Sequence, residues 1–321
     1  MRHILGALAL VTAALCTTPA PAQQYPSRTV TIVAGYAPGS SSDLLARTLG
    51  EALQAKWGQP VVVENRPGSG SNIAAHYVAR SAPDGYTLMV VTDATLTSNV
   101  FLYNAVPFDP VKDFAPIIKA ADNVIVLAVN PKVPAKSVSE FISHAKANPG
   151  KVTYGSSGTG SPHHLAGELL SQLTGVQMSH VPYKGGGPAV NDLVGGHISA
   201  AFLSLSAARP LHDTGKIRIL GSVEKSRYAE MPDVPVIAET VPGFEMTSWM
   251  GLVAPAGTPP AIVSQLNETI TAVLKSPDVI KKLGTLGLAV SSGSPQELAD
   301  TIKTGLDVRG KLVKAAGIKP E

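Results

Sequence analysis

The chain has 321 residues, a formal net charge of +3 and 15% charged residues, and hydrophobic residues make up 44% of it. These values predict a compact soluble protein, and the Lys and Arg residues are scattered singly, which excludes the basic stripe of a nucleic-acid binder. A chain of this length exceeds what a single core usually needs, so two domains are expected.

The first 22 residues predict a secretory signal peptide. Two basic residues precede an apolar run over 4–15, which is much shorter than the ~20 residues that cross a bilayer. Ala20 and Ala22 supply the small residues of a cleavage site. The mature chain is therefore expected to begin near Gln23 and to reside in the periplasm.

Cys16 is the only cysteine and lies inside this segment. Leu15 precedes it, where a lipoprotein signal would have a small residue, so lipidation is not expected. The mature chain then has no cysteine, and core packing must hold its fold without disulfides. No later apolar run reaches membrane-spanning length.

The region after the signal peptide alternates strands and helices. Strands are expected at 30–35, 61–64 and 86–92, where β-branched residues cluster. Helices are expected at 43–57 and 73–81, where apolar residues recur at helical spacing. Such alternation predicts a parallel sheet with helices on both faces.

Two apolar extended segments, 114–130 and 246–254, are expected to cross between two lobes. The part between them predicts helices at 138–147, 163–173 and 189–195 and strands at 152–154, 178–181 and 198–203. Helices at 260–275 and 295–313 should pack back on the first lobe.

The expected fold class is α/β with two lobes, each a mainly parallel sheet flanked by helices. Residues 23–121 and 248–321 are expected to form lobe 1, and residues 122–247 to form lobe 2. Lobe 1 would thus be built from both ends of the chain.

Two loops stand out at the carboxyl ends of expected strands, where open α/β sheets bind ligands. The first runs from Tyr36 to Asp43, and the second from Gly155 to Ser161; both are rich in Gly and Ser and lead into a helix. The free N–H groups of a helix's first turn attract anions, and hydroxyls can complete the shell. Residues 185–188 form a third candidate of the same kind.

A purely structural interpretation is also open for these loops. Ser42 or Ser161 could be simple helix N-caps, and Gly and Ser suit any strand-to-helix turn. Two such loops in separate lobes favour an anion site, because a carboxylate clamped between lobes needs donors from both.

Signals of an enzyme are weak. The chain has no Gly-x-Ser-x-Gly elbow, no phosphate-binding loop with a Gly-Lys pair and no His-Glu-x-x-His helix. His164 and Glu168 share a helix face but lack a third metal ligand, and Asp43 and Asp93 could form an acid pair. No catalytic residue, metal or cofactor is expected.

Aromatic residues near these loops leave two alternatives open. Trp57 and Trp249 are expected to pack in the core or hinge. Tyr36 and Tyr183 could pack or line the cleft, and Tyr36 is the better ligand candidate because it adjoins the Ser-rich loop.

Seven motifs then carry a resemblance to a known family. They lie at 25–27 (YPS), 63–68 (VENRPG), 82–88 (APDGYTL), 108–116 (FDPVKDFAP), 164–169 (HLAGEL), 181–185 (VPYKG) and 254–260 (APAGTPP). In this order they resemble the Bug-type (TctC-like) solute-binding proteins of tripartite tricarboxylate transporters.

The resemblance implies a type II-like periplasmic-binding-protein fold that closes on an organic acid and delivers it to a two-component membrane permease. It implies that loops 36–43 and 154–164 hold a ligand carboxylate, partly through ordered water. Thr92, Thr95 and Asn99 match positions of a third loop that completes the first-lobe side.

Three departures from the family pattern bear on the ligand. Tyr36 and Ser40 stand where Phe and Gly are usual, which adds polar groups and favours a second anion or extra polar atoms. Leu203 and Ser204 stand where many relatives have Asp and Asn. The loss of this acid favours a dicarboxylate or an aromatic carboxylate over an amino acid.

The candidate ligand-binding residues are Tyr36, Pro38, Gly39, Ser40, Ser41, Ser42, Asp43, Thr92, Thr95, Ser156, Ser157, Gly158, Thr159, Gly160, Ser161, His164, Leu203 and Ser204. The expected function is capture of a small carboxylate for a two-component permease, by a monomer. Two alternatives are a carboxylate sensor that signals to a membrane kinase and a periplasmic hydrolase.

Overall fold

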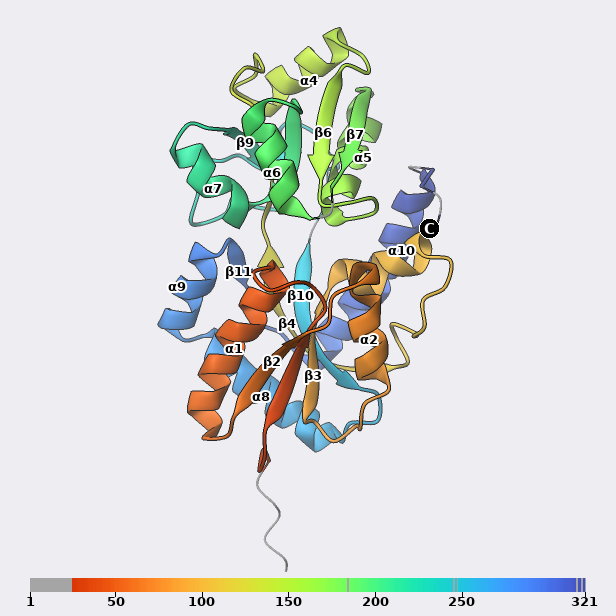
Figure 1. Cartoon of the computed structure of the whole chain (residues 1–321), viewed down its shortest axis with the longest axis vertical. Helices are drawn as coiled ribbons and strands as arrows, with labels where there is room; N and C mark the ends of the chain where they lie inside the picture. The colour runs from red at the N-terminus through yellow and green to blue at the C-terminus, as the bar shows by residue number, and fades with distance from the viewer. Residues whose placement is uncertain are drawn as a thin grey trace, which may run out of the picture.

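The structure is a computed structural model that describes residues 25–183, 185–244, 246, 248–315, 317–318 and 320. The expected signal peptide and Cys16 lie outside the described residues. Figure 1 shows two lobes, one above the other, with little chain between them. This arrangement confirms the expected two-lobed α/β fold.

Lobe 1 denotes the six-stranded sheet and the helices on it. Its elements are β1 (Val30–Ala34), α1 (Ser41–Trp57), β2 (Val61–Asn65), η1 (Ser69–Ser71), α2 (Asn72–Ala79), β3 (Thr87–Thr92), the π-helical turn η2 (Ala94–Ser98), α3 (Asn99–Leu102), β4 (Phe114–Asn123), β10 (Trp249–Pro255), α8 (Pro260–Leu274), α9 (Pro277–Thr285), β11 (Leu288–Val290) and α10 (Pro295–Ala315).

Lobe 2 denotes the five-stranded sheet and its helices. Its elements are β5 (Ile125–Val129), α4 (Val138–Ala147), β6 (Val152–Ser156), α5 (Pro162–Thr174), β7 (Met178–Pro182), α6 (Gly186–Gly195), β8 (Ala200–Ser204), α7 (Leu205–Asp213), β9 (Arg218–Ser222) and η3 (Ile237–Glu239). The boundaries at 121/122 and 247/248 stay predictions, and the two sheets change over between Asn123 and Ile125.

Both sheets are mixed, which corrects the expectation of mainly parallel sheets. The strand orders are β11-β4-β10-β3-β1-β2 and β7-β6-β8-β5-β9. Strand β1 pairs parallel with β2 and β3, and β6 pairs parallel with β7 and β8. The strands beside the crossovers pair antiparallel, because a chain that leaves a lobe and re-enters it comes back in the opposite direction.

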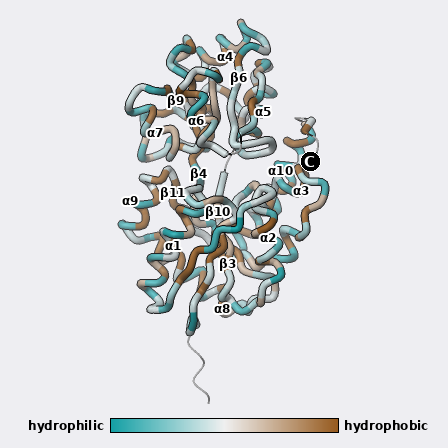
Figure 2. Tube along the Cα trace, viewed as in Figure 1, coloured by the Kyte–Doolittle hydropathy of each residue, from teal (hydrophilic) through white to brown (hydrophobic). Residues whose placement is uncertain are grey.

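Buried apolar residues cover both faces of each sheet. In lobe 1, α1 and α8 contribute to one core and α2 and α10 to the other. In lobe 2, α4 and α5 cover one face and α6 and α7 the other. Figure 2 shows hydrophobic residues interspersed with hydrophilic ones in both the helices and the strands. No helix of the described part of the chain is long and apolar enough to cross a membrane.

The two crossovers lie side by side and are hydrogen-bonded. The Asn123 N–H donates to the Ser248 carbonyl at 2.7 Å. Helix α10 spans the junction, since it packs on β4 and η2 of lobe 1 and also contacts α5, and Val313 near its end is buried in the core of lobe 2. A helix of 21 residues rises about 30 Å, enough to reach both lobes.

Several short elements were not predicted from the sequence: α7, β9, α9 and β11. Helix α7 contains Pro210, which obscures a helical pattern. Strand β11 has only three residues and pairs at the edge of the sheet. Elements this short carry too few periodic positions to be recognised.

Candidate functional site

The first loop places the amino end of α1 at the face of lobe 1 that meets lobe 2 (Figure 1). Ser40 is the N-cap, and its hydroxyl accepts a hydrogen bond from the Asp43 N–H at 3.4 Å. The hydroxyls of Ser40 and Ser42 lie 3.2 Å apart. Pro38 and Gly39 are exposed at the tip of the loop. The loop therefore presents hydroxyls around the amino end of α1, where the free N–H groups carry partial positive charge.

Asp43 holds this loop in shape. Its buried carboxylate accepts hydrogen bonds from the Gly39 N–H at 2.8 Å and from Asn65 Nδ2 at 2.8 Å, and it forms an ion pair with Arg47 at 3.0 Å. Burial alone would raise the pKa of Asp43, but the Arg47, Gly39 and Asn65 hydrogen bonds together lower it. Asp43 therefore stays ionised, and its partners lie in its own lobe.

Tyr36 lies with the third-loop threonines. Burial raises the pKa of the Tyr36 phenol, and hydrogen bonding to Thr92 and Thr95 opposes this rise. The Thr92 and Thr95 hydroxyls are 2.9 Å apart, and the Tyr36 hydroxyl donates to the Gly70 carbonyl at 3.3 Å. The structure thus gathers three candidate hydroxyls from two separate loops of lobe 1.

Asn99 of α3 connects this region to the loop before α2 by hydrogen bonds. Its Nδ2 donates to the Gly70 carbonyl at 2.9 Å and to Asn72 Oδ1 at 2.6 Å. Because Asn99 is buried and donates to both Gly70 and Asn72, it positions the loop before α2 that also receives the Tyr36 hydroxyl.

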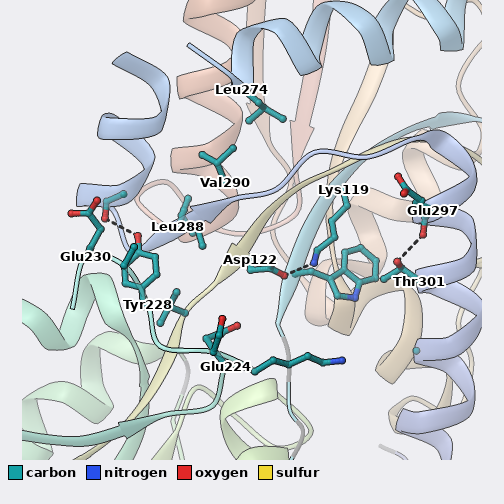
Figure 3. Close-up of a pocket in the computed structure, with 18 of the residues that line it drawn as sticks. Lys119, Asp122, Glu224, Tyr228, Glu230, Leu274, Leu288, Val290, Glu297 and Thr301 are labelled. Carbon is teal, nitrogen blue, oxygen red and sulfur yellow. Dashed lines mark hydrogen bonds and ion pairs between the residues drawn. The ribbon is translucent and has the colours of Figure 1, made fainter. Parts of the chain in front are cut away.

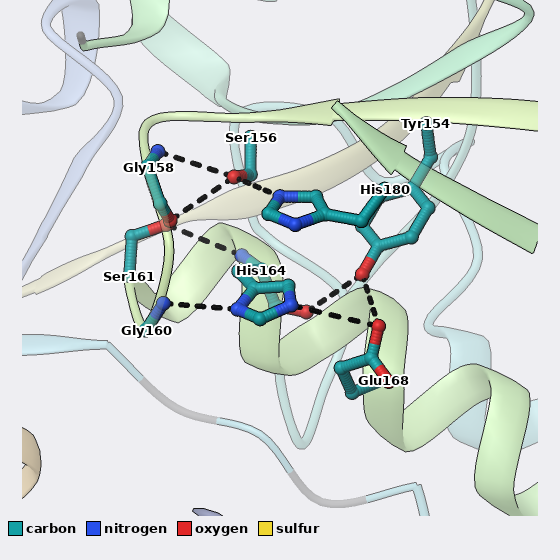
Figure 4. Close-up of polar contacts among 8 residues, drawn as sticks. All are labelled: Tyr154, Ser156, Gly158, Gly160, Ser161, His164, Glu168 and His180. Atoms are coloured by element: carbon teal, nitrogen blue, oxygen red, sulfur yellow. Dashed lines mark hydrogen bonds and ion pairs between the residues drawn. The ribbon is translucent and has the colours of Figure 1, made fainter. Parts of the chain in front are cut away.

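The second loop uses much of its polar surface internally (Figure 4). The Ser156 hydroxyl donates to the Gly158 carbonyl at 3.1 Å and lies 2.7 Å from His180 Nε2. The Ser161 hydroxyl accepts from the His164 N–H at 3.2 Å and donates to the Gly158 carbonyl at 2.7 Å. These two hydroxyls shape the loop, so Ser157 and the exposed Thr159 are the better placed to meet a ligand.

His164 closes the second loop from the first turn of α5. Its Nδ1 accepts a hydrogen bond from the Gly160 N–H at 2.9 Å, so the ring proton resides on Nε2, which faces Glu168 Oε1 at 3.6 Å. The same Oε1 accepts from the Tyr154 hydroxyl at 2.5 Å. In the described part of the chain, no three metal-ligating side chains gather to hold an ion.

The third Gly-rich loop adjoins the second. The Gly185 N–H donates to the Ser157 carbonyl at 3.3 Å, and the Tyr183 N–H donates to the Ser156 carbonyl at 3.2 Å. The Tyr183 hydroxyl donates to Asp192 at 2.6 Å and so is held against α6. Of the open alternatives for Tyr183, the structure favours packing, since the half-buried ring packs against the core of lobe 2.

Leu203 and Ser204 lie on opposite faces of β8, because side chains alternate along a strand. Leu203 is buried in the core of lobe 2 and does not line the candidate site. The Ser204 hydroxyl points the other way and accepts from Asn123 Nδ2 at 3.3 Å. Of these two residues only Ser204 faces the candidate site, so the expected apolar wall at Leu203 is corrected.

A chain of hydrogen bonds joins the two candidate loops through the candidate Ser204 and through Asn123 and His163, which were not among the candidates. Ser41 donates to Asn123 Oδ1 at 3.4 Å, and Ser204 lies 3.4 Å from His163 Nε2. His163 Nδ1 lies 2.8 Å from the Ser157 hydroxyl. The sequence indicates only a crossover at Asn123 and a helix start at His163. The tertiary structure brings both side chains to Ser204.

The lobes also touch directly beside this chain. Gly160 has a φ of +73°, and a Cβ built on it would lie 2.2 Å from Leu102 Cδ1 of α3. Gly175 at the other end of α5 has a nearly equal φ of +72°, but open space surrounds it. A comparison of Gly160 with Gly175 therefore separates the effect of the left-handed backbone from the effect of the contact between the lobes.

Gly160→Ala should therefore destabilise the protein by about 1–3 kcal/mol more than Gly175→Ala, because both pay the left-handed backbone cost and only Gly160→Ala overpacks the lobe contact. Urea denaturation of the two variants measures this difference. Equal losses would show that the second loop does not press on Leu102.

A cavity of about 1130 Å³ lies elsewhere, and none of the candidate residues lines it (Figure 3). Asp122 lines this cavity while its neighbour Asn123 joins the hydrogen-bonded chain, so the two sites lie on opposite faces of the crossover.

Two α/β lobes joined by crossovers, with a hydroxyl-rich helix start from each lobe facing the junction, define a solute-binding protein of the periplasmic type. A family model described as "Tripartite tricarboxylate transporter family receptor" (TctC) matches residues 45–318. The chain belongs to this family, which confirms the resemblance read from the seven motifs.

Individual relatives cover nearly the whole chain. Protein BugT of Bordetella pertussis is 33% identical, with 99% of both chains covered. Rpa4515 of R. palustris, solved with adipate, is 38% identical with a TM-score of 0.86, covering 92% of this chain and 100% of that one. MatC of Rhodopseudomonas palustris, solved with bound malate, is 33% identical with a TM-score of 0.79, covering 90% and 100%.

Proposed function

We propose that this protein works in the periplasm as a monomer, captures a small organic carboxylate between its lobes and delivers it to a two-component membrane permease. The observation that carries the proposal is the pair of helix starts, α1 from lobe 1 and α5 from lobe 2, joined by the chain from Ser41 to Ser157. Family membership supports both the periplasmic location and the permease partner.

Neutral donors supply the attraction for an anion. None of the candidate residues is Lys or Arg, and Asp43 is neutralised by Arg47. What remains are hydroxyls and the partial positive charge of two helix N-termini, which suits a carboxylate and gives no partner for an ammonium group. We therefore expect organic acids to be favoured over amino acids.

The ligand class is a dicarboxylate, with an aromatic carboxylate as second choice. Each lobe contributes one helix start, so a molecule with an anion at each end could satisfy both. The relatives solved with adipate and with malate support this preference, because both ligands are dicarboxylates.

A thermal-shift screen of the mature protein tests the proposal. Adipate, malate, benzoate, citrate and an amino-acid set are compared at equal ionic strength, with adipamide as the uncharged match of adipate. A ligand at 100 times its Kd should stabilise the protein by about 2.7 kcal/mol. A shift with amino acids or adipamide but with no carboxylate would overturn the proposal.

A further inference from the structure

We propose that His163 is a positioning residue: it carries its proton on Nδ1 and thereby turns the Ser157 hydroxyl into a hydrogen-bond donor for the ligand carboxylate. The ligand part rests on the proposed function, whereas the proton arrangement concerns the protein alone. The inference follows from the hydrogen-bonded chain between the lobes.

Asn123 sets the direction of the hydrogen bonds in this series, that is, which group donates and which accepts. An amide oxygen only accepts and an amide nitrogen only donates. Asn123 Oδ1 faces the Ser41 hydroxyl at 3.4 Å, so Ser41 donates to it, and Asn123 Nδ2 faces Ser204 at 3.3 Å, so the Ser204 oxygen accepts. The Ser204 proton is then left for a further partner.

That partner is His163 Nε2, 3.4 Å from the Ser204 oxygen. A ring nitrogen that accepts carries no proton, so a neutral His163 must be protonated on Nδ1. Burial lowers the pKa of His163 to about 4, which keeps the ring neutral at physiological pH. Nδ1 therefore donates to the Ser157 oxygen at 2.8 Å.

Ser157 stands at the end of the chain, in the loop that begins α5. Because its oxygen accepts from His163, its own proton is available to a ligand, and no other hydrogen bond of this hydroxyl occurs among the described residues. The reverse polarity would make Ser157 donate to His163 and present a lone pair, which would repel a carboxylate. Only one of the two directions suits an anion.

The tautomer of His163 can be read directly in the ligand-free protein. Long-range 1H–15N correlation spectra of 15N-labelled protein at pH 7 should show His163 protonated on Nδ1, with the signal assigned by its loss in His163→Gln. His164 is an internal control, because its Nδ1 accepts from the Gly160 N–H and it must be the opposite tautomer. An Nε2-protonated His163 would overturn the proposal whatever the ligand is.

Titration calorimetry with adipate then tests the role of His163 in binding. Ser157→Ala should weaken adipate binding on the order of tenfold, the value of a hydrogen bond to a charged group. His163→Leu should weaken it measurably but by less, because the Ser157 donor remains and only its orientation is lost. The double variant should lose no more than Ser157→Ala, because that substitution already removes the donor. His163→Gln, which keeps a donor and an acceptor, should recover most of the affinity.

The outcomes separate the two proposals. Wild-type affinity in His163→Leu together with lost affinity in Ser157→Ala would overturn the positioning role. Failure of wild-type protein to bind any carboxylate would contradict the proposed function, while the spectrum of His163 would still decide the tautomer. The melting temperature of each ligand-free variant shows whether it is folded.

Discussion

Arg309→Met should lower the free energy of unfolding by about 3–5 kcal/mol, the usual cost of leaving one partner of a buried ion pair alone. Arg309 Nη2 lies 2.8 Å from Asp93 Oδ2, and the two side chains are 6% and 1% exposed. Burial raises the pKa of Asp93 and the Arg309 charge opposes that rise. Without Arg309, the buried Asp93 carboxyl must either keep an unpaired negative charge or take up a proton.

The Arg309–Asp93 ion pair lies at the junction between the lobes. Asp93 follows Thr92 at the end of β3, it accepts from the Ser248 hydroxyl on the second crossover at 3.3 Å, and Arg309 reaches it from α10. The pair therefore fastens the last helix to the crossover beside the candidate site. Loss of the pair should also loosen the junction between the lobes.

Lys311→Ala is the matched control on the same helix. Lys311 pairs with Asp307 at 2.7 Å, but these side chains are 76% and 63% exposed, so its loss should cost less than about 1 kcal/mol. The double variant Asp93→Asn, Arg309→Met should recover part of the lost stability. Urea denaturation measures all three, and similar losses for Arg309→Met and Lys311→Ala would contradict the buried-pair account.

Glu224→Gln should make the protein more stable than wild type at pH 8 by on the order of 4 kcal/mol and remove a pH dependence. Glu224 lies in the cavity on the far face of the crossover, near Asp122 and Lys119 of β4 (Figure 3). Burial, and then the Asp122 charge, raises the pKa of Glu224 from 4.5 to about 8, and Lys119 opposes this.

The raised pKa of Glu224 determines that the protein loses stability as the pH rises. Below pH 4.5 the folded and unfolded chains both hold the proton, and the stability contribution of Glu224 is fully present. Between pH 4.5 and about 8 the unfolded chain loses the proton while the folded chain keeps it, so stability falls as pH rises. Glutamine does not ionise and avoids this loss.

Urea denaturation from about pH 4 to pH 9 checks this prediction. Wild type and Glu224→Gln should agree near the acid end and diverge toward pH 8. Asp122→Asn should make the decline in stability smaller and end it at a lower pH, because Glu224 would lose its like-charged neighbour and its pKa in the folded protein would fall. Parallel curves for wild type and Glu224→Gln would show that Glu224 is ionised in the folded protein.

Much of the fold could be predicted from local patterns. The helix expected at 138–147 has the same bounds as α4, and the strand expected at 30–35 is β1 with one residue fewer. The Gly/Ser loops lie at the amino ends of α1 and α5, as expected from the strand-turn-helix pattern. The antiparallel strands at the crossovers were missed, because strand direction depends on the path of the whole chain.

The amino-acid sequence by itself determined the two-lobed α/β class, most helix and strand positions and the two hydroxyl-rich loops, because periodicity, capping and turn chemistry depend on residues within about one helical turn. The tertiary structure alone decided which hydroxyls remain for a ligand. Asn123 meets Ser204 across 81 residues and Arg309 meets Asp93 across 216, and no local pattern encodes such contacts.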